Sequence, residues 1–251
     1  MSSTTSPLRG LCAIAAACAL WAAGPAQAHQ VWLEQTSTGA TLFFGEFGEN
    51  LREASPGLLD KFVKPTAHKI SAQATQPLVL SKTAGGFAIA GTAAKGESLV
   101  AEEGTYPISE FKDKDKGTTV RSLYQPAARL VTHLGAHPAS LTLDLVPTGT
   151  STKDSVEVQA FYKGKPLPKA KVAIVTASGW AQEHHTNEAG KLTASLPWAG
   201  TYVLELSHAD RTAGQRGTEA YDRANYVTSL TLVQADGLAA LPAPPAAAPN
   251  K

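Results

Sequence analysis

Short apolar runs broken by glycine, proline and serine dominate the chain after its first 28 residues, and this pattern predicts strands. In the clearest case, Val156, Val158 and Ala160 share one parity with Tyr162. Alternation with a period of two places such side chains on one face of a strand. Only residues 56–63 (PGLLDKFV) are expected to form a short helix. The pattern therefore predicts an all-β protein.

The expected strands follow one another along most of the chain. They are residues 29–35 and 40–47, which form a pair around a turn at Gly39, followed by 67–73, 77–81, 86–91, 99–102, 128–133, 141–146, 156–162, 170–176, 192–196 and 202–206. The charged and polar stretch at residues 106–121 is expected to be an exposed loop.

Strands of this length and spacing are typical of β-sandwiches. We expect two packed, β-sandwich-like domains at residues 29–147 and 154–235, the second of them Ig- or transthyretin-like, with a junction at residues 147–153 (PTGTSTK). Residues 236–251 are rich in proline and alanine and cannot bury a core, so they are expected to be disordered.

The first 28 residues have the three parts of a secretory signal peptide. Arg9 precedes an apolar stretch at residues 11–23, and Ala26-Gln27-Ala28 provides a small-x-small cleavage signal. No segment is long and apolar enough to span a bilayer, so we expect an exported, periplasmic protein that is not integral to a membrane. Two alternatives stay open: a buried N-terminal helix, and a lipoprotein acylated at Cys18, which lacks the usual preceding leucine.

Removal of the signal peptide changes the chemistry of the chain. Both cysteines, Cys12 and Cys18, leave with it, so a metal site in the mature protein would use nitrogen and oxygen ligands. This argues against cysteine-rich zinc and iron–sulfur sites. Loss of Arg9 from the 22 basic residues leaves 21, equal to the 21 acidic ones. That balance gives no electrostatic reason to expect binding to nucleic acid or to an anionic membrane.

Cleavage after Ala28 makes His29 the first residue of the mature chain. Its α-amine and its imidazole Nδ1 can then close one chelate ring on a metal ion, and an amine with an ordinary pKa of about 7.7–8.0 loses its proton easily near neutral pH. Nitrogen donors suit a transition-metal ion, with nickel, cobalt and copper as the candidates and copper favoured in raw affinity. Cleavage one residue away would abolish the chelate. The alternative is that His29 is merely a polar residue left by the peptidase.

A second pair of histidines is a candidate to complete the metal site. His133 and His137 are four residues apart, a spacing that would place both on one face of a helix. Gly135 and Pro138 argue against a helix, so the pair is expected at the end of a strand and in the loop after it.

His184 and His185 form a third candidate, just before a tight turn. On a strand, adjacent residues point to opposite faces, so at most one of them would join a given site. The remaining candidates are two histidines expected to be structural and two acidic residues near the first strand pair: His68, His208, Glu46 and Glu49.

Residues 155–208 resemble the small transthyretin-like or carboxypeptidase-regulatory-like sandwich, through VEVQAFYKGKPLPKAKV, TNEAGK and PWAGTYVL. Together with the start His29-Gln30-Val31-Trp32-Leu33, this layout is similar to an exported bacterial family. That family is built on a domain of unknown function and is described as the periplasmic component of nickel/cobalt uptake systems. The resemblance covers nearly all of the mature chain and implies metal handling with an inner- or outer-membrane transporter as partner.

Motifs for hydrolytic enzymes are missing from the sequence, which has neither a G-x-S-x-G elbow nor H-E-x-x-H. We therefore expect a non-enzymatic metal-binding protein. One alternative is a copper-dependent oxidative enzyme with a terminal histidine brace, which needs a second histidine and a flat aromatic surface; Trp180 and Trp198 are the candidates for that surface. The other alternative is a structural or adhesive module without metal.

Overall fold

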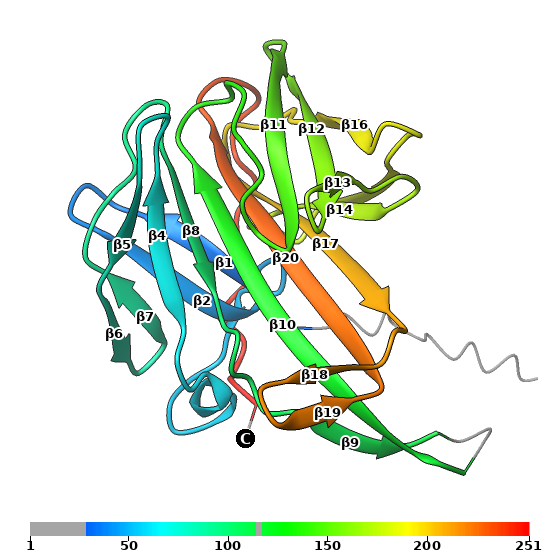
Figure 1. Ribbon diagram of the computed structural model, residues 1–251. Coiled ribbons are helices and arrows are strands. Elements are labelled where there is room, and N and C mark those ends of the chain that lie inside the picture. Colours follow the sequence, from blue (N-terminus) through cyan, green and yellow to red (C-terminus); the bar gives the residue numbers. More distant parts are fainter. Residues whose placement is uncertain (1–28, 114–116, 251) are drawn as a thin grey trace, which may run out of the picture.

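The computed structural model describes residues 29–113 and 117–250, and its regular structure is almost entirely β-strand (Figure 1). The all-β prediction is confirmed. The helix predicted at residues 56–63 is a single 3-10 turn, η1 (Leu58–Lys61). No helix in the described residues has the length and apolar character needed to cross a membrane. The predicted signal peptide lies outside the described residues.

A nine-stranded sheet, here called the central sheet, runs through the molecule. Its strand order is β15-β14-β17-β20-β10-β8-β4-β5, with β9 paired to β10. The long strands β10 and β20 lie at its middle and are parallel, whereas the other pairs described in this sheet are antiparallel. In chain order the bounds are β4 (Thr66–Ile70), β5 (Thr75–Leu78), β8 (Ser98–Glu102), β9 (Ser109–Lys112), β10 (Thr119–Val131), β14 (Lys171–Thr176), β15 (Ala181–His185), β17 (Gly200–Asp210) and β20 (Arg223–Gln234).

Two smaller sheets complete the fold, together with a two-stranded ribbon of β18 (Gly214–Arg216) and β19 (Glu219–Tyr221). The N-terminal sheet has the order β1-β2-β7-β6, with β3 paired to β2. Its strands are β1 (Gln30–Gln35), β2 (Ala40–Glu46), β3 (Leu51–Arg52), β6 (Leu80–Thr83) and β7 (Gly86–Ile89). The C-terminal sheet has the order β11-β12-β13, with β16 paired to β12. Its strands are β11 (Leu143–Ser151), β12 (Ser155–Tyr162), β13 (Lys165–Pro166) and β16 (Lys191–Ser195).

The two smaller sheets cover opposite faces of the central sheet, as alternate side chains of β10 show. Tyr124, Ala128 and Leu130 pack into one core with the N-terminal sheet, whose strands β1 and β2 cross behind β10 in Figure 1. Leu123 and Val131 have the other parity and pack into a second core with the C-terminal sheet. Because side chains alternate along a strand, β10 takes part in two sandwiches at once.

The predicted boundary between two domains does not coincide with a break in the sheets. Residues 147–153, the expected junction, include the end of β11 and the turn into β12. β10 from the first expected domain pairs with β20 from the second over nine positions, from Ser122 with Arg223 to Leu130 with Thr231. The two sandwiches therefore share one sheet, because the central strands find their hydrogen-bonding partners across the expected boundary.

The prediction of disorder for residues 236–251 does not hold for residues 236–250, which contact the folded part of the chain at several points. Leu238 bridges to Trp198 and Ala247 to Leu51, each in parallel orientation. The Asn50 side chain donates a hydrogen bond to the carbonyl oxygen of Pro244 (2.9 Å). Although a proline-rich segment cannot build a core, its carbonyl groups and remaining N–H groups can pair with free backbone and side-chain groups of the folded part. Residues 236–250 are attached to the fold in this way.

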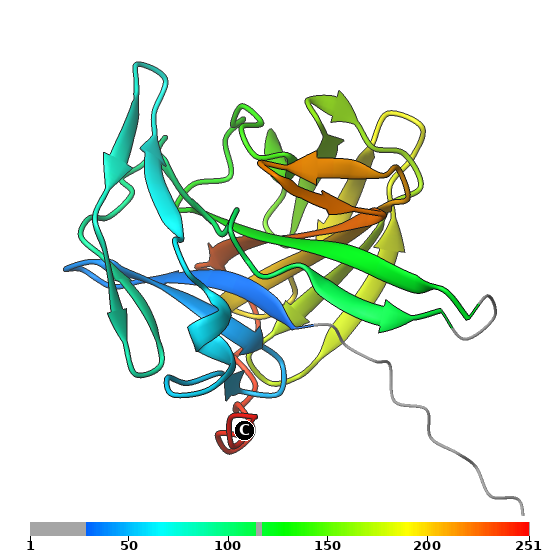
Figure 2. The same ribbon diagram turned by 60° about the horizontal axis from the view of Figure 1, so that its bottom comes forward.

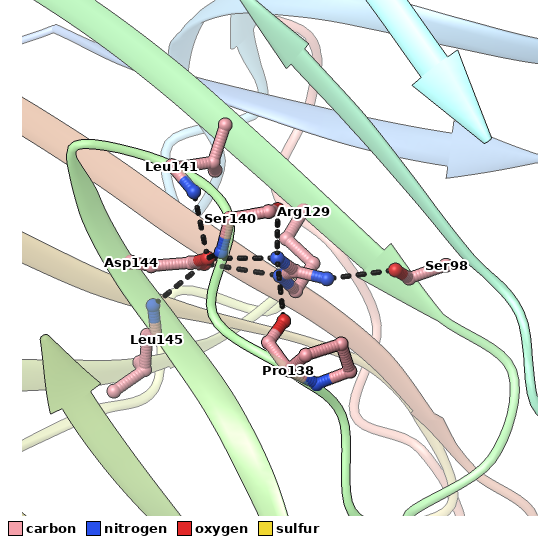
Figure 3. A network of polar contacts seen from close by, with 7 residues as sticks. All are labelled: Ser98, Arg129, Pro138, Ser140, Leu141, Asp144 and Leu145. Atoms are coloured by element: carbon pink, nitrogen blue, oxygen red, sulfur yellow. Dashed lines mark hydrogen bonds and ion pairs between the residues drawn. The ribbon is translucent and has the colours of Figure 1, made fainter. Parts of the chain in front are cut away.

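A buried ion pair joins the C-terminal sheet to the central sheet (Figure 3). The Arg129 guanidinium on β10 donates to both carboxylate oxygens of Asp144 on β11, at 3.0 and 2.7 Å, and both side chains are fully buried. Arg129 also donates to the hydroxyls of Ser98 and Ser140, each at 2.7 Å. The backbone N–H groups of Ser140, Leu141 and Leu145 donate to the Asp144 carboxylate. The network satisfies its charges internally, as a buried ion pair requires.

Candidate metal centre at the start of β1

His29 lies directly before β1, and hydrogen bonds fasten this end of the chain to the central sheet. The Tyr124 hydroxyl donates to the His29 carbonyl oxygen (2.8 Å), and the Ser229 hydroxyl donates to that of Val31 (2.6 Å). Trp32, the next residue, is fully buried. This anchoring gives His29 the fixed position that a preorganised site needs.

Strand register brings two glutamates to the His29 imidazole. β1, β2 and β3 are neighbours in the N-terminal sheet, so the residue before β1 comes next to Glu46 at the end of β2 and Glu53 just after β3. Nε2 of His29 lies 2.5 Å from Glu53 Oε1, and Nδ1 lies 3.9 Å from Glu46 Oε1. The Glu53 side chain is fully buried, whereas those of His29 and Glu46 are 24% and 20% exposed. The imidazole thus has a carboxylate on each side.

Glu53 receives further hydrogen bonds from the C-terminal tail. The backbone N–H of Asn250 donates to Glu53 Oε2 (3.0 Å), and its side-chain amide donates to Oε1 (2.5 Å). Because a carboxylate only accepts hydrogen bonds, the tautomer of the neutral ring that has its proton on Nε2 is the one that donates to Glu53. Nδ1 then has the free lone pair, and it is the nitrogen that faces Glu46.

The Nδ1 side of the imidazole is suited to a metal ion. Two ligands bound at about 2.1 Å are separated by about 3.4 Å in a tetrahedral site and by about 4.2 Å when opposite each other. The 3.9 Å between Nδ1 and Glu46 Oε1 lies between these limits. No group of three or more His, Cys, Asp or Glu side chains within residues 29–113 and 117–250 is placed to hold a metal. A three-donor site at His29 therefore needs the α-amine as well as the two side chains.

His133 and His137 do not join His29, because they lie at the other end of β10. Tyr124, which contacts His29, is near the middle of that strand, and the seven residue-to-residue steps from Tyr124 to Val131 alone span about 23 Å. The two histidines lie close together in the loop after β10, where His137 Nε2 is 3.3 Å from the His133 carbonyl oxygen. Burial lowers the pKa of His137.

His184 and His185 are also far from His29. Both are exposed on β15, the edge strand of the central sheet. Four strand-to-strand steps separate β15 from β10, which corresponds to about 19 Å. The side chain of His184 contacts Gln182 in its own strand, with 3.2 Å between Nε2 and the amide oxygen.

The remaining histidines and the tryptophan pair also lie apart from His29. The His208 ring packs against Tyr162 (centroids 4.3 Å apart), and burial lowers the pKa of His208. His68 lies on β4 opposite Val100. A histidine brace needs a second imidazole, and none of the other six histidines lies at His29. Trp180 and Trp198 pack edge to face on each other, with centroids 4.7 Å apart, so they do not form one flat surface.

An open cavity of about 410 Å³ begins beside His29. Its walls carry aromatic rings, two cationic side chains and several neutral polar groups: Phe44, Tyr106, Phe111, Tyr124, Lys61, Arg223, Ser109, Ser122 and Asn225, together with His29 and Leu58. Burial, with a smaller contribution from the charge of Glu53, raises the pKa of Tyr106 to about 12. Burial also raises the pKa of Tyr124, so both phenols stay neutral hydrogen-bond donors.

Sequence reasoning named His29 and Glu46 as candidates but did not name Glu53, Tyr124 or Asn250, which the structure brings to His29. Glu53 follows a two-residue strand that has no alternating pattern, and Asn250 belongs to a tail whose composition predicted disorder. Glu49, the other acidic candidate, is exposed on the turn between β2 and β3. Tyr124 lies in the stretch LYQPAARL (residues 123–130), and nothing in that stretch indicates contact with the start of the chain.

Comparison with known proteins places the chain in a family without assigning it a task. None of the curated proteins matches the sequence. The model of one family, described as a domain of unknown function (DUF4198), matches residues 26–210, a stretch that includes His29, Glu46 and Glu53 as well as most of the central sheet. Because this match covers well over half of the sequence, the chain belongs to the DUF4198 family.

Proposed function

We propose that this protein is exported to the periplasm and binds a transition-metal ion at His29 without catalysing a reaction. The observation that carries the proposal is the placement of one imidazole between two carboxylates, with Nε2 on buried Glu53 and Nδ1 facing Glu46 at 3.9 Å. Nickel or cobalt uptake, with a membrane transporter as partner, is the task that the resemblance of the sequence favours.

The division of roles between the two glutamates supports a metal on the Nδ1 side. A metal-bound histidine usually donates its second ring N–H to a carboxylate, which fixes the tautomer and raises the basicity of the ligating nitrogen. Glu53 is placed for this supporting role. Glu46, which is partly exposed, is placed to contribute an oxygen, and the α-amine freed by cleavage after Ala28 would close the chelate ring with Nδ1.

The direct test is metal titration of the mature protein purified from the periplasm. Intact-mass measurement first establishes that His29 is the terminus, and Ni²⁺, Co²⁺, Cu²⁺ and Zn²⁺ are then titrated by calorimetry. We expect one ion to bind per chain with at least micromolar affinity. Absence of binding for all four ions at micromolar concentrations would overturn the proposal.

Three variants distinguish the contributions of the three proposed metal donors. His29→Ala removes the imidazole and should abolish binding, whereas an alanine inserted between Ala28 and His29 keeps the imidazole but moves the amine and should weaken binding strongly. Glu46→Gln should weaken it by loss of the charged oxygen. Glu49→Gln is the matched control, since this carboxylate is exposed on the turn that follows β2, and it should leave the affinity unchanged.

A further inference from the structure

The side chains that line the cavity beside His29 carry an excess of positive charge. Two cationic side chains, Lys61 at the end of η1 and Arg223 at the start of β20, line it, and no carboxylate does. Residues of η1 and of β9 both line it, and the start of β1 lies between these two elements in Figure 2. Over the whole sequence the formal charge is close to balance, at +1, so the local excess of positive charge is a property of this cavity.

No ion pair joins Lys61 or Arg223 to another residue within the described part of the chain. The acidic neighbours of Phe111 and Arg223 in the sequence are engaged elsewhere: Glu110 pairs with Arg121 (3.3 Å), and Asp222 accepts the backbone N–H of Arg121 (2.7 Å). Nε of Arg223 is buried without a hydrogen-bond partner. Such a group lacks compensation for its lost hydration.

Aromatic rings hold the arginine and shape the rest of the cavity. The Arg223 guanidinium lies over the Phe111 ring, with 4.4 Å between Cζ and the ring centroid. Stacking fixes the plane of a guanidinium and leaves its N–H edges for a planar anion such as a carboxylate. The edge-to-face pair of Tyr106 and Tyr124 provides an apolar wall with neutral hydroxyl groups.

We infer that this cavity binds a small organic carboxylate with a flat, apolar body. The two cations recognise the carboxylate, and the aromatic walls take the body. A volume of about 410 Å³ lies within the usual range for small-molecule sites. The inference goes beyond the proposed metal site and does not depend on it, because the cavity residues named for recognition are separate from Glu46 and Glu53.

The test uses metal-free mature protein, so that its outcome is independent of metal binding. Benzoate is the probe, and benzamide and acetate are its controls, since benzamide keeps the ring without the charge and acetate keeps the charge without the ring. Calorimetry or saturation-transfer NMR should show benzoate binding and about tenfold weaker binding of each control. Equal affinity for benzamide, or no binding of benzoate at millimolar concentration, would overturn the inference.

Variants then locate the binding site. Arg223→Gln and Lys61→Gln should each weaken benzoate binding by about tenfold, because each removes a charged hydrogen-bond donor. Lys165→Gln is the matched control and should have no effect, because this exposed lysine on β13 forms no ion pair with another residue that the structure describes. Thermal melts establish that each variant is folded. Benzoate affinity that is unchanged in both cavity variants, or lowered equally by the control, contradicts the proposed site.

Discussion

Nε2 of His29 lies 2.5 Å from Oε1 of Glu53, a fully buried carboxylate 24 residues further along the chain. Two features of the fold create this contact. The register of β1, β2 and β3 sets the two residues side by side, and the C-terminal tail covers Glu53 through Asn250. The contact fixes which ring nitrogen faces outward, so it decides whether His29 can present Nδ1 to a metal.

Glu53→Gln should therefore lower metal affinity although Glu53 is not a ligand. Substitution of a carboxylate that orients a metal-bound histidine typically lowers affinity about 10–100-fold. The expected result is a loss in this range for the ion that binds tightest, measured by competition with a chelator of known affinity. A thermal melt shows whether the variant stays folded. Metal affinity equal to that of the parent would mean that Glu53 does not orient His29 for metal binding.

Asn250→Ala should destabilise the fold through the same carboxylate. The substitution removes the side-chain donor to Glu53 Oε1 and leaves the backbone N–H to Oε2 in place. Loss of one donor to a buried charged group typically costs about 1–3 kcal/mol. Urea unfolding of the mature protein measures this loss.

Deletion of residues 245–251 is the companion experiment to Asn250→Ala. It removes both donors to Glu53 and the bridge between Leu51 and Ala247. The deletion should therefore cost more stability than the single substitution. A tail deletion that leaves the free energy of unfolding unchanged would show that the tail does not hold Glu53.

Arg129→Met should be among the most damaging single changes in the protein. It leaves the Asp144 carboxylate fully buried without its counter-charge, and removal of one partner of such a pair typically costs about 3–5 kcal/mol. The matched control is Lys171→Met, which breaks a pair with Glu183 whose side chains are more than half exposed, and this change should cost far less. Urea unfolding of both variants makes the comparison. Equal losses would contradict the structural role of the buried pair.

Alternating segments were the part of the fold that sequence predicted best. Val156, Val158 and Ala160 share one parity and are all fully buried on β12. Residues 106–121 were expected to be a loop, but β9 and the first residues of β10 pair there with all four residues of β9 exposed. Without a buried face, a hairpin leaves no hydrophobic pattern in the sequence.

β20, at the middle of the central sheet, was missed for a different reason. β20 carries Tyr226, Leu230 and Leu232 toward one core, but Ser229 and Thr231 on its other face are buried as well. Buried hydroxyl residues resemble exposed ones in a hydropathy pattern. The parallel pairing of β10 with β20 joins segments about a hundred residues apart, and local patterns contain no information about such contacts.

The same limit applies to the metal site. The proposal of a terminal chelate rests on the sequence around His29 alone, whereas the groups that contact His29 come from strand register and from the tail. The other candidate ligands were selected by residue type alone. In the structure they lie either beyond the far end of β10 or on the edge strand β15: His133, His137, His184 and His185. Residue type identified candidate ligands, but only the topology could select among them.

Glu102→Gln should stabilise the protein in a pH-dependent way. Burial is the largest cause of a raised pKa at Glu102; Asp144 adds to the shift, and His68 opposes it. Because the pKa in the folded state exceeds the ordinary value of 4.5, the folded protein binds the proton more tightly than the unfolded chain. The stability that comes from this proton is present below about pH 4.5 and is lost as the pH rises through the folded-state pKa.

Glutamine does not titrate, so the Glu102→Gln variant should be more stable than the parent at pH 7 and lose that advantage near pH 4. Urea unfolding from pH 4 to 8 measures the difference, with Glu49→Gln as the exposed control. An advantage that grows as the pH falls would show that the shift has the opposite sign.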